Sequence, residues 1–185
     1  MPLLVLLNGV PASGKSTTAF HWASRRPLAL ALDIDVLRSM LGGWTSDPVE
    51  AGLTARRLAV QMIRSHLSEG KDVIVPQFIG VAGIPFIEDL ARVAAEVGAT
   101  FREVALVAPA DVASRRWNER VDADHPHGRA ALVHGPLEAS MAHAVLAHEE
   151  FLRSRADAII VDSADGDALA TSRRLDAALR DGHGV

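Results

Sequence analysis

The chain has 185 residues, a mass of 19.7 kDa and a formal charge of −4 at pH 7, and 49% of its residues are hydrophobic. This composition supports a substantial buried core, and we expect a single domain over residues 1–185. The negative charge argues against a general nucleic-acid binder. The absence of cysteine excludes disulfides and thiolate zinc sites and leads us to expect a cytoplasmic protein. No stretch approaches the roughly 20 apolar residues of a membrane span, so we expect no membrane partner.

Apolar runs alternate with helical patterns along the whole chain. Strands are predicted at residues 3–7, 28–35, 72–78, 100–108 and 157–163. Helices are predicted at residues 15–24, 36–41, 48–69, 85–97, 110–121, 136–153 and 167–180. Strands joined by helices of this length predict an α/β fold, with a five-stranded parallel sheet covered by helices on both faces.

The helix predicted at residues 48–69 has the clearest start signal. Asp47 is the expected N-cap, Pro48 the first helical residue, and Glu50 the reciprocal partner of a capping box. Apolar residues at helical spacing then predict one inward face, formed by Val49, Leu53, Val60, Ile63 and Leu67.

A glycine loop at residues 9–16, "GVPASGKS", follows the first predicted strand and matches the pattern G-x-x-x-x-G-K-[ST] in full. Such a loop wraps phosphate groups with its own amides, at the positive end of the helix that follows. We expect it to bind ATP, with Lys15 on the β and γ phosphates and Ser16 on Mg²⁺. The expected nucleotide contacts are Gly9, Pro11, Ala12, Ser13, Gly14, Lys15, Ser16 and Thr17. The alternative is a glycine turn that carries a lysine by chance.

The second predicted strand ends in two acidic residues, Asp33 and Asp35, separated by apolar Ile34. Alternation along a strand places both carboxylates on one side of the sheet edge. We expect Asp33 to support Mg²⁺ and Asp35 to accept the proton of an incoming hydroxyl. Arg38, three residues after Asp35, is close enough to share its site.

The glycine loop followed by "DIDVLR" resembles a group of small P-loop kinases that contains polynucleotide kinase, chloramphenicol phosphotransferase, zeta toxins and gluconate kinase. The resemblance implies a P-loop NTPase fold of the adenylate-kinase type with a small helical lid. It also implies that Asp35 is the general base for the acceptor hydroxyl and that Arg38 helps to hold the substrate. The backbone around Ser163 falls where related kinases contact the base of the nucleotide.

Two arginines are candidates for stabilising the transferred phosphate. Arg116 and Arg120 are one turn apart on a predicted helix, and we expect residues 116–134 to form a lid that closes over the site. The alternative is a solvated, charged helix face. An arginine of this lid is also an alternative partner for Asp33, whose remaining alternative role is a helix N-cap.

Two further residues are candidates for contacts with the acceptor. The third predicted strand ends in Gln77, where many P-loop ATPases carry a carboxylate, so we expect Gln77 to face the acceptor. Its alternative role is a polar strand-end residue in solvent. Trp44 is expected either to form a wall of the acceptor pocket or to pack on the neighbouring helix.

These features together predict an ATP- and Mg²⁺-dependent kinase that phosphorylates a hydroxyl group of a small molecule. The resemblance to chloramphenicol phosphotransferase favours an antibiotic or a nucleoside-like alcohol as the acceptor. Two alternatives stay open: a 5′-hydroxyl polynucleotide kinase, which the acidic charge disfavours, and an ATPase switch that is not a kinase.

Overall fold

The computed structural model of the protein describes residues 1–121, 137–155, 157–163 and 167–181. Five strands are present: β1 (Leu3–Asn8), β2 (Leu30–Ala31), β3 (Val73–Pro76), β4 (Thr100–Val107) and β5 (Ile159–Asp162). The helices are α1 (Lys15–Ala23), α2 (Ile34–Ser39), α3 (Pro48–Ser68), η1 (Val81–Gly83), α4 (Ile84–Glu96), α5 (Ala110–Val121), α7 (Leu137–Ser154) and α8 (Ala168–Asp181). None of the helices in these described ranges is long and apolar enough to cross a membrane.

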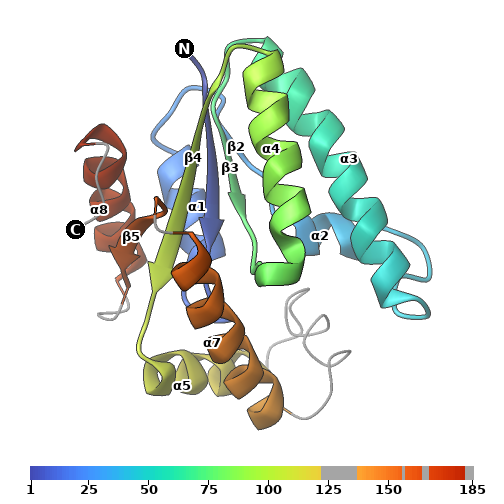
Figure 1. Ribbon diagram of the computed structural model, residues 1–185, viewed down its shortest axis with the longest axis vertical. Coiled ribbons are helices and arrows are strands. Elements are labelled where there is room, and N and C mark those ends of the chain that lie inside the picture. Colours follow the sequence, from blue (N-terminus) through green and yellow to red (C-terminus); the bar gives the residue numbers. More distant parts are fainter. Residues whose placement is uncertain (122–136, 156, 164–166, 182–185) are drawn as a thin grey trace.

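All five strands are parallel and lie in the order β2-β3-β1-β4-β5. The predicted α/β fold with a five-stranded parallel sheet is therefore confirmed. β1 is the central strand, and its last residues Leu7 and Asn8 lie beside Pro76 of β3 and Ala105 of β4. The arrows of β1, β3 and β4 in Figure 1 point toward the end of the sheet around which α2, α5 and α7 lie. This carboxyl edge is where parallel α/β sheets bind their ligands.

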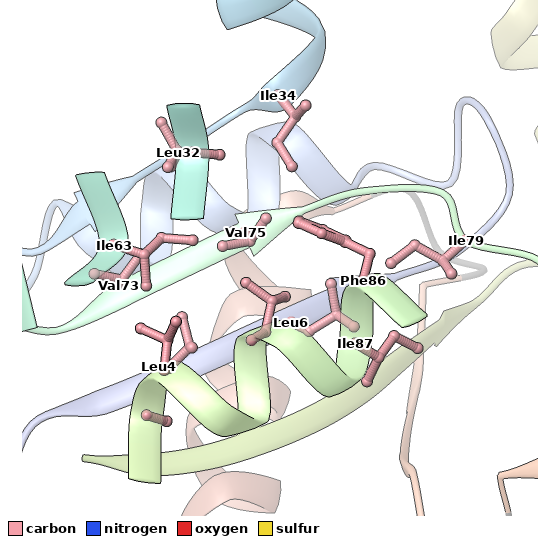
Figure 2. Close-up of a cluster of buried hydrophobic side chains, with 14 of the residues drawn as sticks. Leu4, Leu6, Leu32, Ile34, Ile63, Val73, Val75, Ile79, Phe86 and Ile87 are labelled. Carbon is pink, nitrogen blue, oxygen red and sulfur yellow. The ribbon is translucent and has the colours of Figure 1, made fainter. Parts of the chain in front are cut away.

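The sheet has a hydrophobic core on each face. On one face α3 and α4 pack against β1 and β3, and Figure 2 shows Leu4, Leu6, Val73 and Val75 of the strands directed toward this layer. On the other face α1 and α8 pack around the fully buried Trp22. Because β1 is covered on both faces, a continuous apolar run is the sequence that suits it.

The second strand is much shorter than the predicted 28–35. Leu28 has a left-handed φ of 55°, so the regular extended backbone begins only after it. At the other end, the Asp33 carboxylate accepts hydrogen bonds from the backbone N–H groups of Asp35 and Val36 and caps α2. Asp35 therefore lies in the first turn of α2, and the prediction that it ends the strand is wrong.

The inward face predicted for α3 is wrong at its N-terminal end. Val49 and Leu53 are exposed, whereas a stripe of small residues faces the core: Ala51, Ala55 and Ala59, followed by Ile63 and Leu67. Small side chains there let α3 lie close to α2 and the sheet. Asp47 caps the helix as predicted, but the Glu50 carboxylate bonds Thr54 and Arg57 rather than completing a capping box.

The core between α3 and the sheet gives a stability prediction. Ile63→Ala removes a fully buried side chain and leaves a cavity, so we expect a loss of about 2–5 kcal/mol in the free energy of unfolding. Leu58→Ala, on the same helix but 43% exposed, serves as the control and should cost under about 1 kcal/mol. Urea unfolding followed by circular dichroism measures both. Equal losses would contradict this assignment of the core face.

Candidate active site

The glycine loop is fixed at its start by the side chain of Asn8. Asn8 is fully buried, and its Oδ1 accepts hydrogen bonds from the backbone N–H groups of Gly9 (2.8 Å) and Ile79 (2.9 Å). Its Nδ2 donates to the carbonyl of Ile79 at 2.9 Å. One amide thus ties the loop to the segment that follows β3. Sequence analysis missed Asn8, although a polar residue that ends an otherwise apolar strand is a usable signal.

The loop backbone comes close to its surroundings and adopts left-handed angles. A Cβ at Gly9 would lie 2.6 Å from the carbonyl oxygen of Leu106 and 2.8 Å from Ser13 Oγ. Gly14 has φ 94°, and the non-glycine Ala12 has φ 60°, a conformation that disfavours L side chains. Pro11 is half-buried, and Thr17 is exposed at the start of α1. The loop is therefore held in a strained, tightly packed path.

Lys15 and Ser16 occupy the end of the loop predicted to hold phosphate and metal. Lys15 Nζ donates to the carbonyl of Val10 at 2.8 Å. Ser16 Oγ donates to Asp33 Oδ2 at 2.7 Å, while the other oxygen of Asp33 caps α2. The Asp33 carboxylate thus has two roles. It caps α2, which sequence analysis kept as an alternative, and it contacts Ser16.

These residues fit a bound magnesium nucleotide in their chemistry. Ser13 Oγ is buried in the loop without a hydrogen-bond partner, as expected of a donor kept for a phosphate oxygen. A hydroxyl next to a carboxylate, as in Ser16 and Asp33, is a donor set that Mg²⁺ accepts together with phosphate oxygens. In the described part of the chain, no group of three or more His, Cys, Asp or Glu could hold a metal by itself. Phosphate oxygens would therefore supply the remaining ligands.

Asp35 and Arg38 lie together, as predicted, and Trp44 lies beside Arg38. Asp35 Oδ1 is 3.2 Å from the Arg38 guanidinium one helical turn later, and the Asp35 side chain remains 35% exposed. Arg38 is buried, its guanidinium lies 5.2 Å from the centre of the Trp44 ring, and its Nε has no hydrogen-bond partner. The half-buried Trp44 therefore lies against Arg38 of α2, and its role as a wall of the acceptor pocket stays a prediction.

Gln77 follows β3 and is buried, so its alternative role as a solvent-exposed strand end is wrong. Its backbone N–H continues the pairing to Leu7 at 3.1 Å. Its side-chain Nε2 makes a long hydrogen bond to the Phe78 carbonyl, at 3.4 Å, and its Oε1 has no partner. A buried amide oxygen without a donor is costly, which fits a contact that a ligand completes.

Arg56 of α3 is a candidate that sequence analysis missed. Its guanidinium lies 5.3 Å from the centre of the Phe86 ring. Burial lowers the pKa of Arg56 from its usual value, the negative charge of Asp35 raises it and the positive charge of Arg38 lowers it. Arg56 is therefore near both site residues. Nothing in the pattern "ARRLAV" distinguishes it from its exposed neighbour Arg57.

Arg116 and Ser163 lie next to each other on the other side of the carboxyl edge of the sheet. Arg116 Nη2 donates to the carbonyl of Ser163 at 3.0 Å, and Ser163 Oγ donates to Val107 at 3.0 Å. Two predicted nucleotide contacts are thus neighbours. Arg120 lies within α5, but its side chain is outside the described residues, as are residues 122–134 of the predicted lid. The lid and the pairing of Arg116 with Arg120 stay predictions.

His148 of α7 is a third residue that sequence analysis missed. It is buried, stacks on Phe151 with ring centroids 6.3 Å apart, and its Nε2 has no hydrogen-bond partner. Burial lowers its pKa from 6.5 to about 4, and the positive charge of Lys15 contributes further. Ala144, one turn earlier on the same face of α7, is also buried. Met141, about two turns before His148, packs against Val10 of the glycine loop. α7 is therefore in contact with the phosphate loop.

The close approach at Gly9 predicts a loss of nucleotide affinity. In Gly9→Ala the new methyl group would overlap the Leu106 carbonyl, which belongs to a central strand and cannot yield easily. We expect the loop to shift and calorimetry to show ATP binding weakened by about tenfold or more. Gly52→Ala is the control, because nothing lies within 4 Å of its Cβ position. Unchanged ATP affinity in Gly9→Ala would contradict this assignment.

The buried His148 predicts a pH dependence of stability. Above pH 6.5 the imidazole is neutral in both states. Between pH 6.5 and about 4 only the unfolded chain gains the proton, so stability falls, by about 3 kcal/mol when the loss is complete. His148→Phe, which keeps a ring on Phe151, should flatten this part of the curve, and His143→Phe, at an exposed position, should not. Urea unfolding at pH 7.5 and pH 5 tests this, and parallel curves for wild type and His148→Phe would refute it.

Known proteins resemble the chain in both sequence profile and fold. The profile of a family described as AAA domain, AAA_33, matches residues 4–144. No protein of curated function matches the sequence.

Shikimate kinase from Acinetobacter baumannii, in complex with shikimate, has a TM-score of 0.68 and 17% identity, over 98% of this chain and 94% of that one. A sugar kinase from Janibacter sp. has a TM-score of 0.65 and 19% identity, over 100% and 99%. Kti12 from Chaetomium thermophilum, in complex with ADP-AlF3, has a TM-score of 0.63 and 16% identity, over 98% and 100%.

Identities this low show the fold and no more. The matched structures confirm the P-loop NTPase fold and the resemblance to small P-loop kinases. The sequence profile adds the family, because its match spans most of the described chain, from β1 into α7. The protein belongs to the AAA_33 family of AAA domains.

Proposed function

We propose that the protein is an ATP-dependent kinase that transfers the γ-phosphoryl group of ATP to a hydroxyl of a small molecule. One observation carries this proposal: the Asp33 carboxylate bonds Ser16 of the glycine loop with one oxygen and the backbone N–H of Asp35 with the other. This bridge ties the first turn of α2, which carries Asp35, to the end of the phosphate loop. This tie supports Asp35 as the base that takes the proton of the acceptor hydroxyl.

The residues of the glycine loop would bind the triphosphate through their N–H groups and through Lys15. Ser16 and Asp33 would hold Mg²⁺, which supplies positive charge to the phosphate oxygens and orients them. Arg116, at the opposite side of the edge, would exchange its hydrogen bond to Ser163 for one to a phosphate oxygen.

Asp35 would orient the acceptor hydroxyl and take its proton. The alcohol oxygen forms a bond to the γ-phosphorus, the bond from that phosphorus to the β–γ bridging oxygen breaks, and ADP leaves. The ion pair with Arg38 uses Oδ1 of Asp35. Oδ2 accepts no hydrogen bond from the described residues, so it remains available to an alcohol.

The nature of the acceptor is a separate question from the reaction. The buried Gln77 Oε1 lacks a donor, and a hydroxyl or amide group of a bound acceptor would supply one. The antibiotic or nucleoside-like alcohol suggested by resemblance stays a prediction.

Removal of the Asp35 carboxylate tests the proposal. We expect wild-type protein, incubated with ATP, Mg²⁺ and a library of hydroxyl-bearing metabolites and antibiotics, to add one phosphoryl group to an acceptor detected by mass spectrometry. Asp35→Asn should lower the transfer rate about 100-fold or more, because a positioned general base contributes about 10²–10⁴-fold. Its affinity for ATP should be unchanged.

Asp157→Asn is the matched control, because Asp157 is exposed just before β5, at the opposite end of the sheet. It should keep full activity. Steady ATP turnover without any acceptor, and equal turnover in Asp35→Asn, would instead indicate an ATPase switch and overturn the kinase proposal.

A further inference from the structure

His148 and Gln77 are buried polar side chains whose hydrogen bonds the described residues leave incomplete. His148 is 5% exposed and its Nε2 has no partner, and Gln77 is 9% exposed and its Oε1 has no partner. A buried polar atom without a partner is costly and therefore rare in native proteins. A ligand or a bound water is the usual source of the missing hydrogen bond.

The packing of α7 on the segment after β3 brings these two residues to the same part of the molecule. Gln77 directly follows β3, and α7 packs against η1, a few residues further along. A Cβ at Gly80 would lie 3.5 Å from the Cβ of Ala147, the residue before His148. His148 is therefore beside the segment that begins with Gln77.

The glycine loop borders the same face of α7. Met141, about two turns before His148, packs against Val10 of the loop. The carbonyl of Val10 in turn accepts the hydrogen bond of Lys15 Nζ at 2.8 Å. Burial lowers the pKa of His148, and the positive charge of Lys15 lowers it further. His148 thus lies where α7 meets both the glycine loop and the segment after β3.

The two unpartnered atoms suit an uncharged group. With a pKa of about 4, His148 is neutral at pH 7 and has one N–H donor and one acceptor nitrogen. Gln77 Oε1 is an acceptor only, so it would repel the oxygens of a carboxylate or phosphate. A hydroxyl group both donates and accepts, so it suits either atom.

We propose that His148 and Gln77 bind a second, uncharged hydroxyl group of the acceptor molecule, separate from the hydroxyl that takes the phosphoryl group. The identity of the occupant as the acceptor rests on the proposed kinase function. Asp35 acts on one hydroxyl and these two residues hold another, so the acceptor carries at least two. His148 is then a residue that sets specificity and takes no part in the proton transfer.

The first test detects the contact without catalysis. The glycine loop is filled with Mg²⁺ and a non-hydrolysable ATP analogue, and glycerol and myo-inositol are then titrated separately. We expect the nitrogen resonance of His148 Nε2, assigned by its loss in His148→Phe, to shift with at least one of these polyols. The matched single alcohols, 1-propanol and cyclohexanol, should leave it unchanged. No shift with either polyol, or equal shifts with the single alcohols, would overturn the proposal.

The second test measures affinity for the polyol that gives the larger shift, as acceptor with ATP and Mg²⁺ at pH 7.5. His148→Phe keeps a ring beside Phe151 but removes both nitrogen atoms. We expect it to raise KM for the polyol about tenfold, as for a hydrogen bond lost in a buried site, and to leave KM for ATP unchanged. Gln77→Leu should act in the same direction. His148→Gln, which restores a polar group, should recover part of the loss.

His143→Phe is the matched control, because His143 is exposed on the same helix. It should keep the wild-type KM for the polyol. Wild-type KM in both His148→Phe and Gln77→Leu, with circular dichroism showing both variants folded, would mean that water fills the site and would overturn the proposal.

The outcomes separate this inference from the kinase proposal. Transfer to 1-propanol and cyclohexanol as readily as to the polyols would support the kinase but refute the second hydroxyl contact. A polyol-dependent shift of the His148 resonance, without phosphoryl transfer to any acceptor, would support the hydroxyl-binding site but refute the kinase.

Discussion

The carboxylate of Asp33 is the contact on which the geometry of the candidate site depends. One of its oxygens accepts from Ser16 at the end of the glycine loop, and the other caps the N-terminus of α2. A single side chain thus sets the distance between the phosphate loop and the helix that carries Asp35 and Arg38. Neither partner lies in the hydrophobic core, so this distance is set by hydrogen bonds with narrow geometric limits rather than by adaptable apolar packing.

Asn8 has the corresponding role at the other end of the loop. It ties Gly9 to Ile79, and hence to the segment that begins with Gln77. The two ties share a physical feature, since each uses one polar side chain with two or more hydrogen bonds to fix a turn that has no regular pairing. The consequence is that the glycine loop is tied to the segments that follow β2 and β3, where the candidate acceptor residues lie.

Much of this arrangement is predictable from local sequence, and the rest depends on contacts between distant segments. The strand pattern and the glycine loop were predictable because each is defined within a few residues. The end of β2 was not, because the strand competes with the cap that Asp33 provides for α2. The inward face of α3 was misassigned because hydrophobicity favoured Val49 and Leu53, whereas close packing selected the alanines. Arg56 was missed because its role depends on α2 and α4, which no pattern within α3 reveals.

The overall negative charge of the chain does not conflict with the arginines on its surface. A nucleic-acid strand is held through several phosphates at once, and each contact requires a positive side chain along the path of the strand. Here three arginines of α3 and α4 are neutralised by nearby acids and do not form such a path: Arg57 by Glu50, Arg64 by Glu96 and Arg92 by Asp89. The same ion pairs thereby favour a small-molecule acceptor over a polynucleotide.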